Sequence, residues 1–172
     1  FGSETLKMFE KAPHVGGVIT SADEEKTVNL FKMHETELEK RKALFSEFGG
    51  DYQSYCRSGK EKLPNIVVFI HNFSNFIEQY DEMGDTFSLL ARDGVKYGIY
   101  FMVTATGVGA VRYRYQQNFK TMLTLQLNDA SDYSMVVGKT EGVLPSKFRG
   151  RGLVNQGKVY EFQTARATPA ED

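Results

Sequence analysis

The 172-residue chain has no tryptophan, a single cysteine and no long apolar run, and each of these absences narrows the possibilities. Cys56 has no second cysteine to pair with, so an intrachain disulfide is excluded and a reducing compartment is favoured. The longest strongly apolar run, Ile66–Ile70, is far shorter than the about 20 residues that a membrane-spanning helix needs. The N-terminus lacks a signal-peptide layout. We therefore expect a soluble, cytosolic piece of protein.

An excess charge of one sign is also missing. The formal net charge is -1, which gives no global field that would draw the chain to nucleic acid or anionic lipid. A hydrophobic content of 41% and a charged content of 25% are typical of one globular domain with its own core. The first residue is Phe1, so we interpret the chain as a piece of something longer.

A long amphipathic helix is predicted between Ser21 and Gly49. Ser21-Ala22-Asp23-Glu24 has the pattern of a capping box, and Gly49-Gly50 would end the helix. Apolar residues recur at near-heptad spacing, at Val28, Phe31, Leu38 and Phe45. We expect the charged residues between them to face solvent, namely Glu35, Glu37, Glu39, Lys40, Arg41 and Lys42.

Strands and helices alternate after this helix. Ile66–Ile70 and Ile99–Val103 indicate parallel strands covered on both faces, with helical segments between positions 76 and 97 and Asp85 as a cap. A basic helix at 110–118, a strand at 122–127 and a helix capped by Asp129 follow. The alternation predicts an α/β fold with a mainly parallel sheet and helices on both faces.

The end of the chain has a different pattern. Two apolar segments, 152–154 and 159–162, flank Asn155-Gln156-Gly157 and indicate a closing antiparallel hairpin. We expect one domain over residues 1–165 and a disordered tail at 166–172.

Two phosphate-binding motifs are matched only in part. Gly138-Lys139-Thr140 has the tail of a P-loop, but Tyr133 stands where the first glycine belongs and the triplet follows a helix, so we interpret it as a helix stop. Gly107-Val108-Gly109 follows a strand, as a dinucleotide fingerprint does, but Arg112 replaces the third glycine. A flexible turn at the sheet edge is the simpler interpretation.

The end of the first buried strand is the most informative position. A nucleoside triphosphatase of this architecture would place an acidic pair there to hold Mg²⁺, whereas this chain has His71-Asn72. Neither side chain replaces a carboxylate as a Mg²⁺ ligand. His71 read alone is more often a hydrogen-bonded strand-edge residue than a catalyst, and no nucleophile motif accompanies it.

Basic residues interleave with tyrosines after the second strand, in Arg112-Tyr113-Arg114-Tyr115. This pattern suits a subunit or domain interface, a plain surface, or contact with phosphate and stacked bases. The candidate interface or ligand residues are Arg112, Arg114, Lys120, Arg149 and Arg151.

The chain resembles the FtsK/SpoIIIE-type ATPases in three segments. These are the string from Leu63-Pro64-Asn65 through His71-Asn72, residues 97–101, and Gly150-Arg151-Gly152-Leu153. The chain is most similar to a C-terminal ATPase module of the EssC-like membrane ATPases of type VII secretion. The resemblance covers nearly the whole chain and implies a RecA-like P-loop fold. By the resemblance, the first strand and P-loop would precede Phe1, and Phe1-Gly2 would be the end of the next strand.

The resemblance also identifies the departures from the family pattern. The Walker B acidic residues fall on His71 and Asn72, and the sensor-like Ala-Thr-Gln falls on Thr104-Ala105-Thr106, without the glutamine. A basic residue of the family falls on Met122. The positions that would face nucleotide are therefore His71, Asn72, Thr104 and Thr106.

These departures predict a degenerate module that serves as a scaffold, a regulatory nucleotide site or a docking domain. The alternatives are an active motor module that recruits Glu78 or Asp81, and a nucleotide- or DNA-binding domain that uses residues 107–114. We expect no cofactor or metal requirement in this piece, with ATP and Mg²⁺ bound by the parent. The implied partners are neighbouring ATPase modules, other secretion subunits and small helical export substrates. The implied location is the cytoplasmic side of a plasma-membrane protein.

Overall fold

The computed structural model describes residues 4–166. The chain divides into two compact units. The first unit contains Phe1–Thr106 and Ala110–Asn118, and the second contains Gly107–Gly109 and Phe119–Asp172. Residues 167–172 of the tail expected at 166–172, and the strand remnant expected at Phe1-Gly2, lie outside the described residues.

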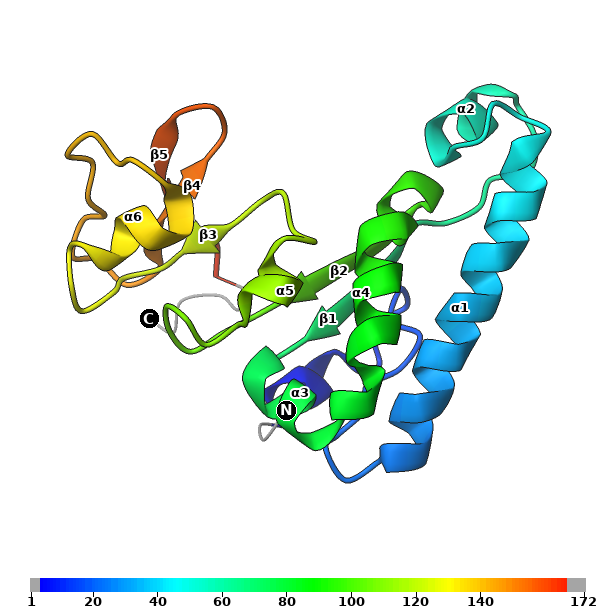
Figure 1. The fold of residues 1–172 in the computed structure, drawn as a ribbon, viewed down its shortest axis with the longest axis horizontal. Helices are drawn as coiled ribbons and strands as arrows, with labels where there is room; N and C mark the ends of the chain where they lie inside the picture. Colours follow the sequence, from blue (N-terminus) through cyan, green and yellow to red (C-terminus); the bar gives the residue numbers. More distant parts are fainter. Residues whose placement is uncertain (1–3, 167–172) are drawn as a thin grey trace. The chain divides into compact units, whose positions relative to one another are not determined.

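The first unit is built around two parallel strands, β1 (Ile66–Ile70) and β2 (Ile99–Val103). Its helical elements are η1 (Thr5–Phe9), α1 (Glu24–Ser46), α2 (Tyr52–Arg57), α3 (Phe73–Gln79), η2 (Asp81–Met83), α4 (Gly84–Asp93), η3 (Gly94–Tyr97) and α5 (Tyr113–Gln116). The crossover from β1 to β2 runs through α3 and α4, as a parallel pair requires. Figure 1 shows α1 and α4 running alongside the strands.

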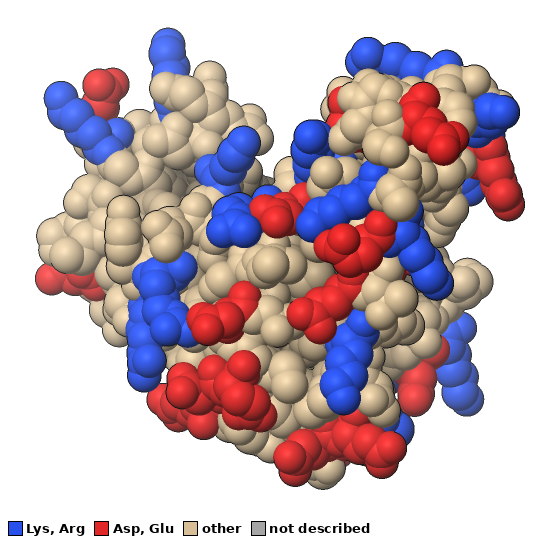
Figure 2. All heavy atoms as spheres, turned by 45° about the vertical axis from the view of Figure 1, so that its right-hand side comes forward, with Lys and Arg blue, Asp and Glu red and all other residues tan. Residues whose placement is uncertain are grey.

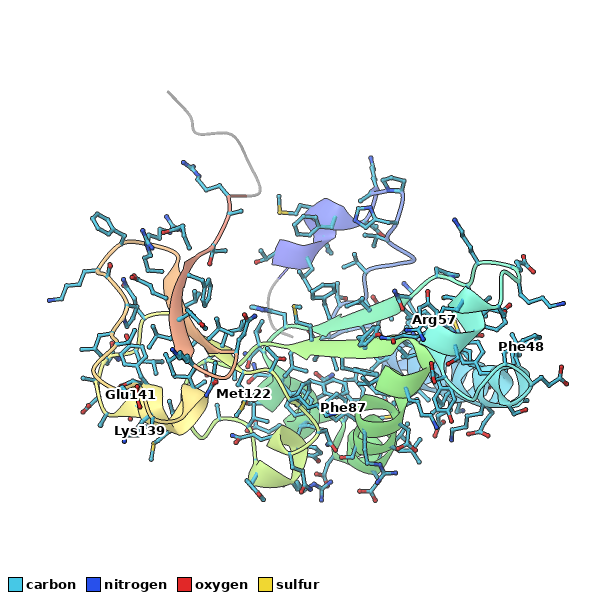
Figure 3. The ribbon with its side chains drawn as sticks, turned by 90° about the horizontal axis from the view of Figure 1, so that it is seen from above. Phe48, Arg57, Phe87, Met122, Lys139 and Glu141 are labelled. Atoms are coloured by element: carbon cyan, nitrogen blue, oxygen red, sulfur yellow. The ribbon has the colours of Figure 1, made fainter. Side chains whose placement is uncertain are left out.

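The two faces of this sheet differ in their cover. Helices lie on one face, and the segment containing η1 lies on the other (Figure 3). Val68 packs on the helical side, whereas Val67, Phe69 and Met102 keep 47%, 58% and 54% of their surface exposed. Within the described residues, the expected cover on both faces is therefore close on the helical face and only partial on the face of the η1 segment.

An aromatic cluster forms the core of the first unit. Phe73 packs against Phe87 with the rings tilted by 46° and their centroids 4.7 Å apart, and Tyr115 meets both rings edge-on. Phe31 of α1 stacks on Phe76 at 5.6 Å. Each of these side chains is at most 3% exposed, so α1, α3, α4 and α5 are fixed against one another by apolar burial.

The second unit is a three-stranded antiparallel sheet in the order β3 (Leu123–Thr124), β4 (Arg151–Asn155) and β5 (Val159–Gln163). The predicted closing hairpin is confirmed, with Leu153 opposite Glu161. Helix α6 (Asp132–Val137) packs on this sheet through Tyr133 and Val137, which meet Leu153. The predicted parallel sheet is thus confined to β1 and β2, and a separate antiparallel sheet follows.

Three predicted helix caps are wrong in detail. α1 begins at Glu24 after Asp23, whose carboxylate accepts bonds from Thr20 and does not cap the helix. Asp85 lies inside the first turn of α4. Asp129 accepts bonds from the amide and hydroxyl of Ser131, which closes a turn before α6 begins at Asp132. For Asp23 and Asp129 the acidic side chain is satisfied by a local turn, which competes with the helix cap, whereas the exposed Asp85 carboxylate lies 3.5 Å from Arg114.

Two predicted elements are shorter than expected. The basic helix at 110–118 forms only the four residues of α5, and the strand at 122–127 forms only the two residues of β3. In the first case Arg112 is extended, with φ -59° and ψ 143°, so the helix cannot begin before it.

Candidate functional site

The carboxyl ends of β1 and β2 bring His71, Asn72 and Thr104 together, as the sequence predicts for the edge that would face a nucleotide. The Thr104 hydroxyl lies 2.9 Å from His71 Nδ1 and accepts a 3.0 Å bond from the Asn72 amide. The Thr104 backbone donates to Ile70 O at 3.1 Å and accepts from the Phe73 amide at 2.9 Å. Thr104 therefore clamps the whole turn from β1 into α3.

Asn72 adopts a left-handed conformation, with φ 56° and ψ 70°. Such a conformation costs non-glycine residues energy, and asparagine tolerates it better than most. It allows α3 to begin at once after β1, and the hydrogen bonds of Thr104 hold it in place. Thr106 is exposed in the loop that follows β2, and it is not one of the residues that form this clamp.

The chemistry of this edge does not suit Mg²⁺. His71 and Asn72 offer an imidazole and an amide, whereas Mg²⁺ prefers carboxylate and water oxygens in octahedral geometry. Glu78 is exposed on α3, and Asp81 is exposed in η2 beyond the C-terminal end of α3, so neither replaces a strand-end carboxylate. Within residues 4–166, no group of three or more His, Cys, Asp or Glu side chains could hold a metal ion. The residues present therefore do not fit a Mg²⁺-nucleotide site.

A small cavity adjoins this edge in the first unit. Its volume is about 40 Å³, and it is lined by Phe69, His71 and residues of the N-terminal segment such as Glu4 and Ile19. A water molecule occupies about 30 Å³ in the liquid, so the cavity is of the size of water rather than of a nucleotide. Glu4 is in addition engaged by Lys7 at 2.8 Å.

The glycine-rich turn after β2 does not have the construction of a dinucleotide loop. A Cβ atom placed on Gly107 or Gly109 would meet nothing within 4 Å, so no close approach demands these glycines, although the φ of 79° at Gly109 favours one. The helix that follows, α5, has only four residues. The Ser74 hydroxyl donates to Ala110 O at 2.7 Å and ties the turn to α3. This geometry agrees with the simpler interpretation of a turn.

Two of the five basic candidates, Arg112 and Arg114, lie in the first unit. Arg114 packs over the Tyr115 ring at 4.6 Å, donates to the Tyr115 hydroxyl at 2.7 Å and reaches Asp85 at 3.5 Å. Tyr115 is fully buried, so it belongs to the core and cannot stack on a base. The remaining exposed pair is Arg112 and Tyr113, with Tyr113 79% exposed.

The other three basic candidates lie in the second unit. Lys120 precedes β3, and Arg149 is exposed in the loop before β4. Arg151 reaches Glu161 at 3.8 Å, and its Nε atom is buried with no hydrogen-bond partner. The Ser146 amide donates to Glu161 at 2.7 Å and, ahead of Arg151, lowers the pKa of that carboxyl. Arg151 is thus part of the sheet, as the first residue of β4 beside Glu161 of β5.

The Gly138-Lys139-Thr140 triplet is a helix stop, as predicted. Gly138 follows α6 with φ 77°, and its amide closes the last turn on Ser134 O. Asn155 donates to Val137 O at 2.8 Å and satisfies the helix end. Figure 3 shows Lys139 and Glu141 in the loop beyond α6, away from any helix N-terminus that could bind phosphate.

Sequence reasoning missed one structural residue, Arg41. The prediction that it faces solvent is wrong, because the side chain is only 2% exposed. Its guanidinium donates to Glu37 at 2.7 Å, to Tyr97 O at 2.9 Å and to Pro64 O at 2.8 Å. Arg41 therefore joins the residues that lead into β1 and β2. The seven-residue spacing from Thr27 to His34 to Arg41 is the only signal in the sequence that places it on the buried side.

The face drawn in Figure 2 carries no continuous basic surface. Figure 2 shows acidic side chains gathered toward the lower part of the visible face and basic side chains scattered over it. A duplex or single strand would need a continuous basic surface. None of the described helices has the length and apolar character that crossing a bilayer requires.

No family model matches the chain. The chain is 31% identical over 173 residues to the ESX secretion system protein YukB of Bacillus subtilis, a match that covers all of the chain and 12% of YukB. It therefore spans about an eighth of the length of this curated relative.

Two solved structures extend the likeness to the fold. EssC (ATPases 2 and 3) from Geobacillus thermodenitrificans matches with a TM-score of 0.89 at 28% identity, over 100% of this chain and 33% of that chain. Thermomonospora curvata EccC (ATPases 2 and 3) in complex with a signal sequence peptide matches with a TM-score of 0.75 at 25% identity, over 95% and 30%. These matches confirm the RecA-like α/β class. The EssC, EccC and YukB type VII secretion ATPases are therefore homologues of this chain, which matches an ATPase segment of these longer proteins over its whole length.

Proposed function

We propose that this chain is a degenerate ATPase module of a type VII secretion motor, which acts without hydrolysing ATP. The observation that carries the proposal is the edge at the carboxyl ends of β1 and β2. There His71 and Asn72 stand where Mg²⁺ needs carboxylates, and the Thr104 hydroxyl is bonded to both of them. The clamp serves the turn into α3, so this edge has a structural role that does not depend on nucleotide.

The chain also corresponds to part of a module. It covers 33% of the EssC structure that contains two ATPases. If the two ATPases divide that chain equally, each takes about half of it, and the match corresponds to about two thirds of one ATPase. We place residues 1–165 in one such partial module, with its Walker A segment outside the chain.

The proposed roles of the module follow from the longer relatives. Nucleotide and Mg²⁺ binding would belong to the parent protein, in modules that retain the acidic pair. The parent would be a membrane-anchored protein with this module on the cytoplasmic side. A module without turnover can still hold neighbouring modules together or bind a partner, provided that its affinity differs between two states of the motor.

Two kinds of partner are consistent with the comparisons. EccC of Thermomonospora curvata was solved with a signal sequence peptide, which supports a helical export substrate as one partner. Neighbouring ATPase modules are the other, because two ATPases lie together in the matched structures. The exposed residues Arg112, Lys120 and Arg149 are the candidates for either contact, along with Arg151 at the start of β4.

A titration with a fluorescent ATP analogue and Mg²⁺ tests the proposal. It compares this chain with a longer version that includes the preceding segment implied by the resemblance. Failure of both to bind below about 1 mM, or about -4 kcal/mol, would indicate a structural module. Binding by the longer version without turnover would indicate a regulatory site, and tight binding with turnover would refute the proposal.

A further inference from the structure

We propose that the cavity between α2 and the residues leading into β1 binds a small organic anion with an apolar body. The cavity has a volume of about 430 Å³ and is lined by Tyr52, Cys56, Lys60, Lys62, Leu63 and Pro64. Small-molecule sites commonly have volumes of about 300 to 1,000 Å³. The cavity lies at the amino end of β1, the opposite end from His71, so the inference is independent of the proposed function.

The wall of the cavity is apolar and held in place. The Tyr52 hydroxyl donates to Leu63 O at 2.7 Å, and Arg41 donates to Pro64 O at 2.8 Å. The Tyr52 ring lies so close to Gly98 that a Cβ atom there would stand 2.7 Å from Tyr52 Cδ2. Burial raises the pKa of Tyr52, so the phenol stays neutral at physiological pH. A ligand would meet a preformed surface, which lowers the entropic cost of binding.

The rim of the cavity is cationic. Lys60 and Lys62 line it, and Arg57, labelled in Figure 3, is the last residue of α2. Lys60 Nζ also lies 5.8 Å from the centroid of the Phe48 ring, which restrains that side chain near the rim.

Acidic side chains are fewer than basic ones around this cavity, and one of them, Asp51, is already hydrogen-bonded. Glu61 stands between the two lysines in the sequence. Asp51, before α2, accepts bonds from the amide and hydroxyl of Ser54 at 2.8 and 3.0 Å. An apolar wall with two lysines at its rim therefore complements a ligand that carries a carboxylate or sulfonate on an aromatic or aliphatic body.

The chain supplies its own reporter for this site, because its single cysteine, Cys56, is exposed and lines the cavity. Alkylation of Cys56 by N-ethylmaleimide can be followed by mass spectrometry with and without a ligand. The probe is 8-anilinonaphthalene-1-sulfonate, an aromatic sulfonate. At a probe concentration about ten times its Kd, we expect the alkylation rate to fall about tenfold. Probe bound to other apolar surfaces would leave Cys56 unprotected.

Matched controls separate charge from apolar contact. The double variant Lys60→Gln, Lys62→Gln should raise the probe concentration needed for half-protection of Cys56 by about two- to tenfold, since each exposed charge contributes modestly. Lys158→Gln, an exposed lysine at the hairpin tip of the second unit, should leave protection unchanged. The neutral analogue N-phenyl-1-naphthylamine should protect less well than the sulfonate. Absence of saturable protection up to about 1 mM probe, or equal protection by the neutral analogue and in the double variant, would overturn the assignment.

Discussion

Replacing Arg41 by methionine should destabilise the first unit more than any other change on the charged part of α1. The guanidinium makes three hydrogen bonds from a side chain that is 2% exposed, and two of them reach the backbone before β1 and β2. Methionine keeps much of the volume of the stem and none of the donors. The variant Arg41→Met therefore isolates the hydrogen bonds from the packing.

The size of the effect follows from the bonds that are lost. A hydrogen bond to a charged group contributes about 1.5 to 3 kcal/mol, so the bonds to Tyr97 O and Pro64 O would account for about 3 to 6 kcal/mol. Methionine avoids the desolvation cost of a buried cation, which offsets part of the loss. Glu37 is 29% exposed and can turn toward water. We expect a net loss of about 2 to 4 kcal/mol in the free energy of unfolding.

Urea unfolding followed by near-ultraviolet circular dichroism of the tyrosines measures this loss. Lys40→Met, on the exposed side of the same helix, is the matched control and should change stability by less than about 0.5 kcal/mol. A loss of less than about 1 kcal/mol for Arg41→Met would refute the assignment of Arg41 as the link between α1 and the two strands.

Three further predictions concern other parts of the chain. Thr104→Val should lower the free energy of unfolding by about 1 to 3 kcal/mol, because the Asn72 amide and His71 lose their partner, whereas Thr106→Val should be neutral in the same urea titration. Gly152→Ala should cost about 1 to 3 kcal/mol, because its Cβ would stand 2.3 Å from Thr124 O; Gly16→Ala, with open space around it, is the control for thermal unfolding. Bonds from Ser54 lower the pKa of Asp51, so its contribution to stability is present above pH about 4 and is lost as the pH falls through the lowered pKa. Asp51→Asn should flatten that part of an acid-unfolding curve, and an unchanged curve would contradict the cap.

The buried side of α1 shows where sequence reasoning fails. Phe31, Leu38 and Phe45 are buried at seven-residue spacing, as predicted. A second buried row, Thr27, His34 and Arg41, runs beside them at the same spacing. Each polar member finds a local or backbone acceptor: Thr27 bonds Asp23 O and His34 bonds Leu30 O. Because polar residues are usually exposed, a hydrophobicity pattern assigns this row to solvent.

The strands show a different limit. Every residue of Ile66–Ile70 is apolar, so no alternation marks which face is covered. The sequence therefore predicts the strand and its parallel pairing, but not the exposure of Val67 and Phe69. That exposure depends on what packs on the sheet, which is not encoded in the strand itself.

The sequence predicts where the candidate site lies in the fold, but it does not predict the hydrogen bonds and backbone conformation that form it. The apolar runs of β1 and β2, together with the resemblance, predict that His71 and Thr104 follow the ends of these strands. The carboxyl ends of parallel strands lie at one edge of a sheet, so the two residues are expected to be close together. The Thr104 clamp and the left-handed Asn72 could not be read from the sequence, since both depend on the register between β1 and β2. The split of the basic residues between two units follows from tertiary structure in the same way.

ATP turnover by the longer version of the chain, with the preceding segment restored, tests the central claim most directly. The native His71-Asn72 protein is compared with the variant His71→Asp, Asn72→Glu, in which carboxylates return to the end of β1. We expect no phosphate release above background from the native protein, whether or not it binds nucleotide. Steady turnover by the native protein, abolished when Glu78 or Asp81 is replaced by alanine, would contradict it and show an active module.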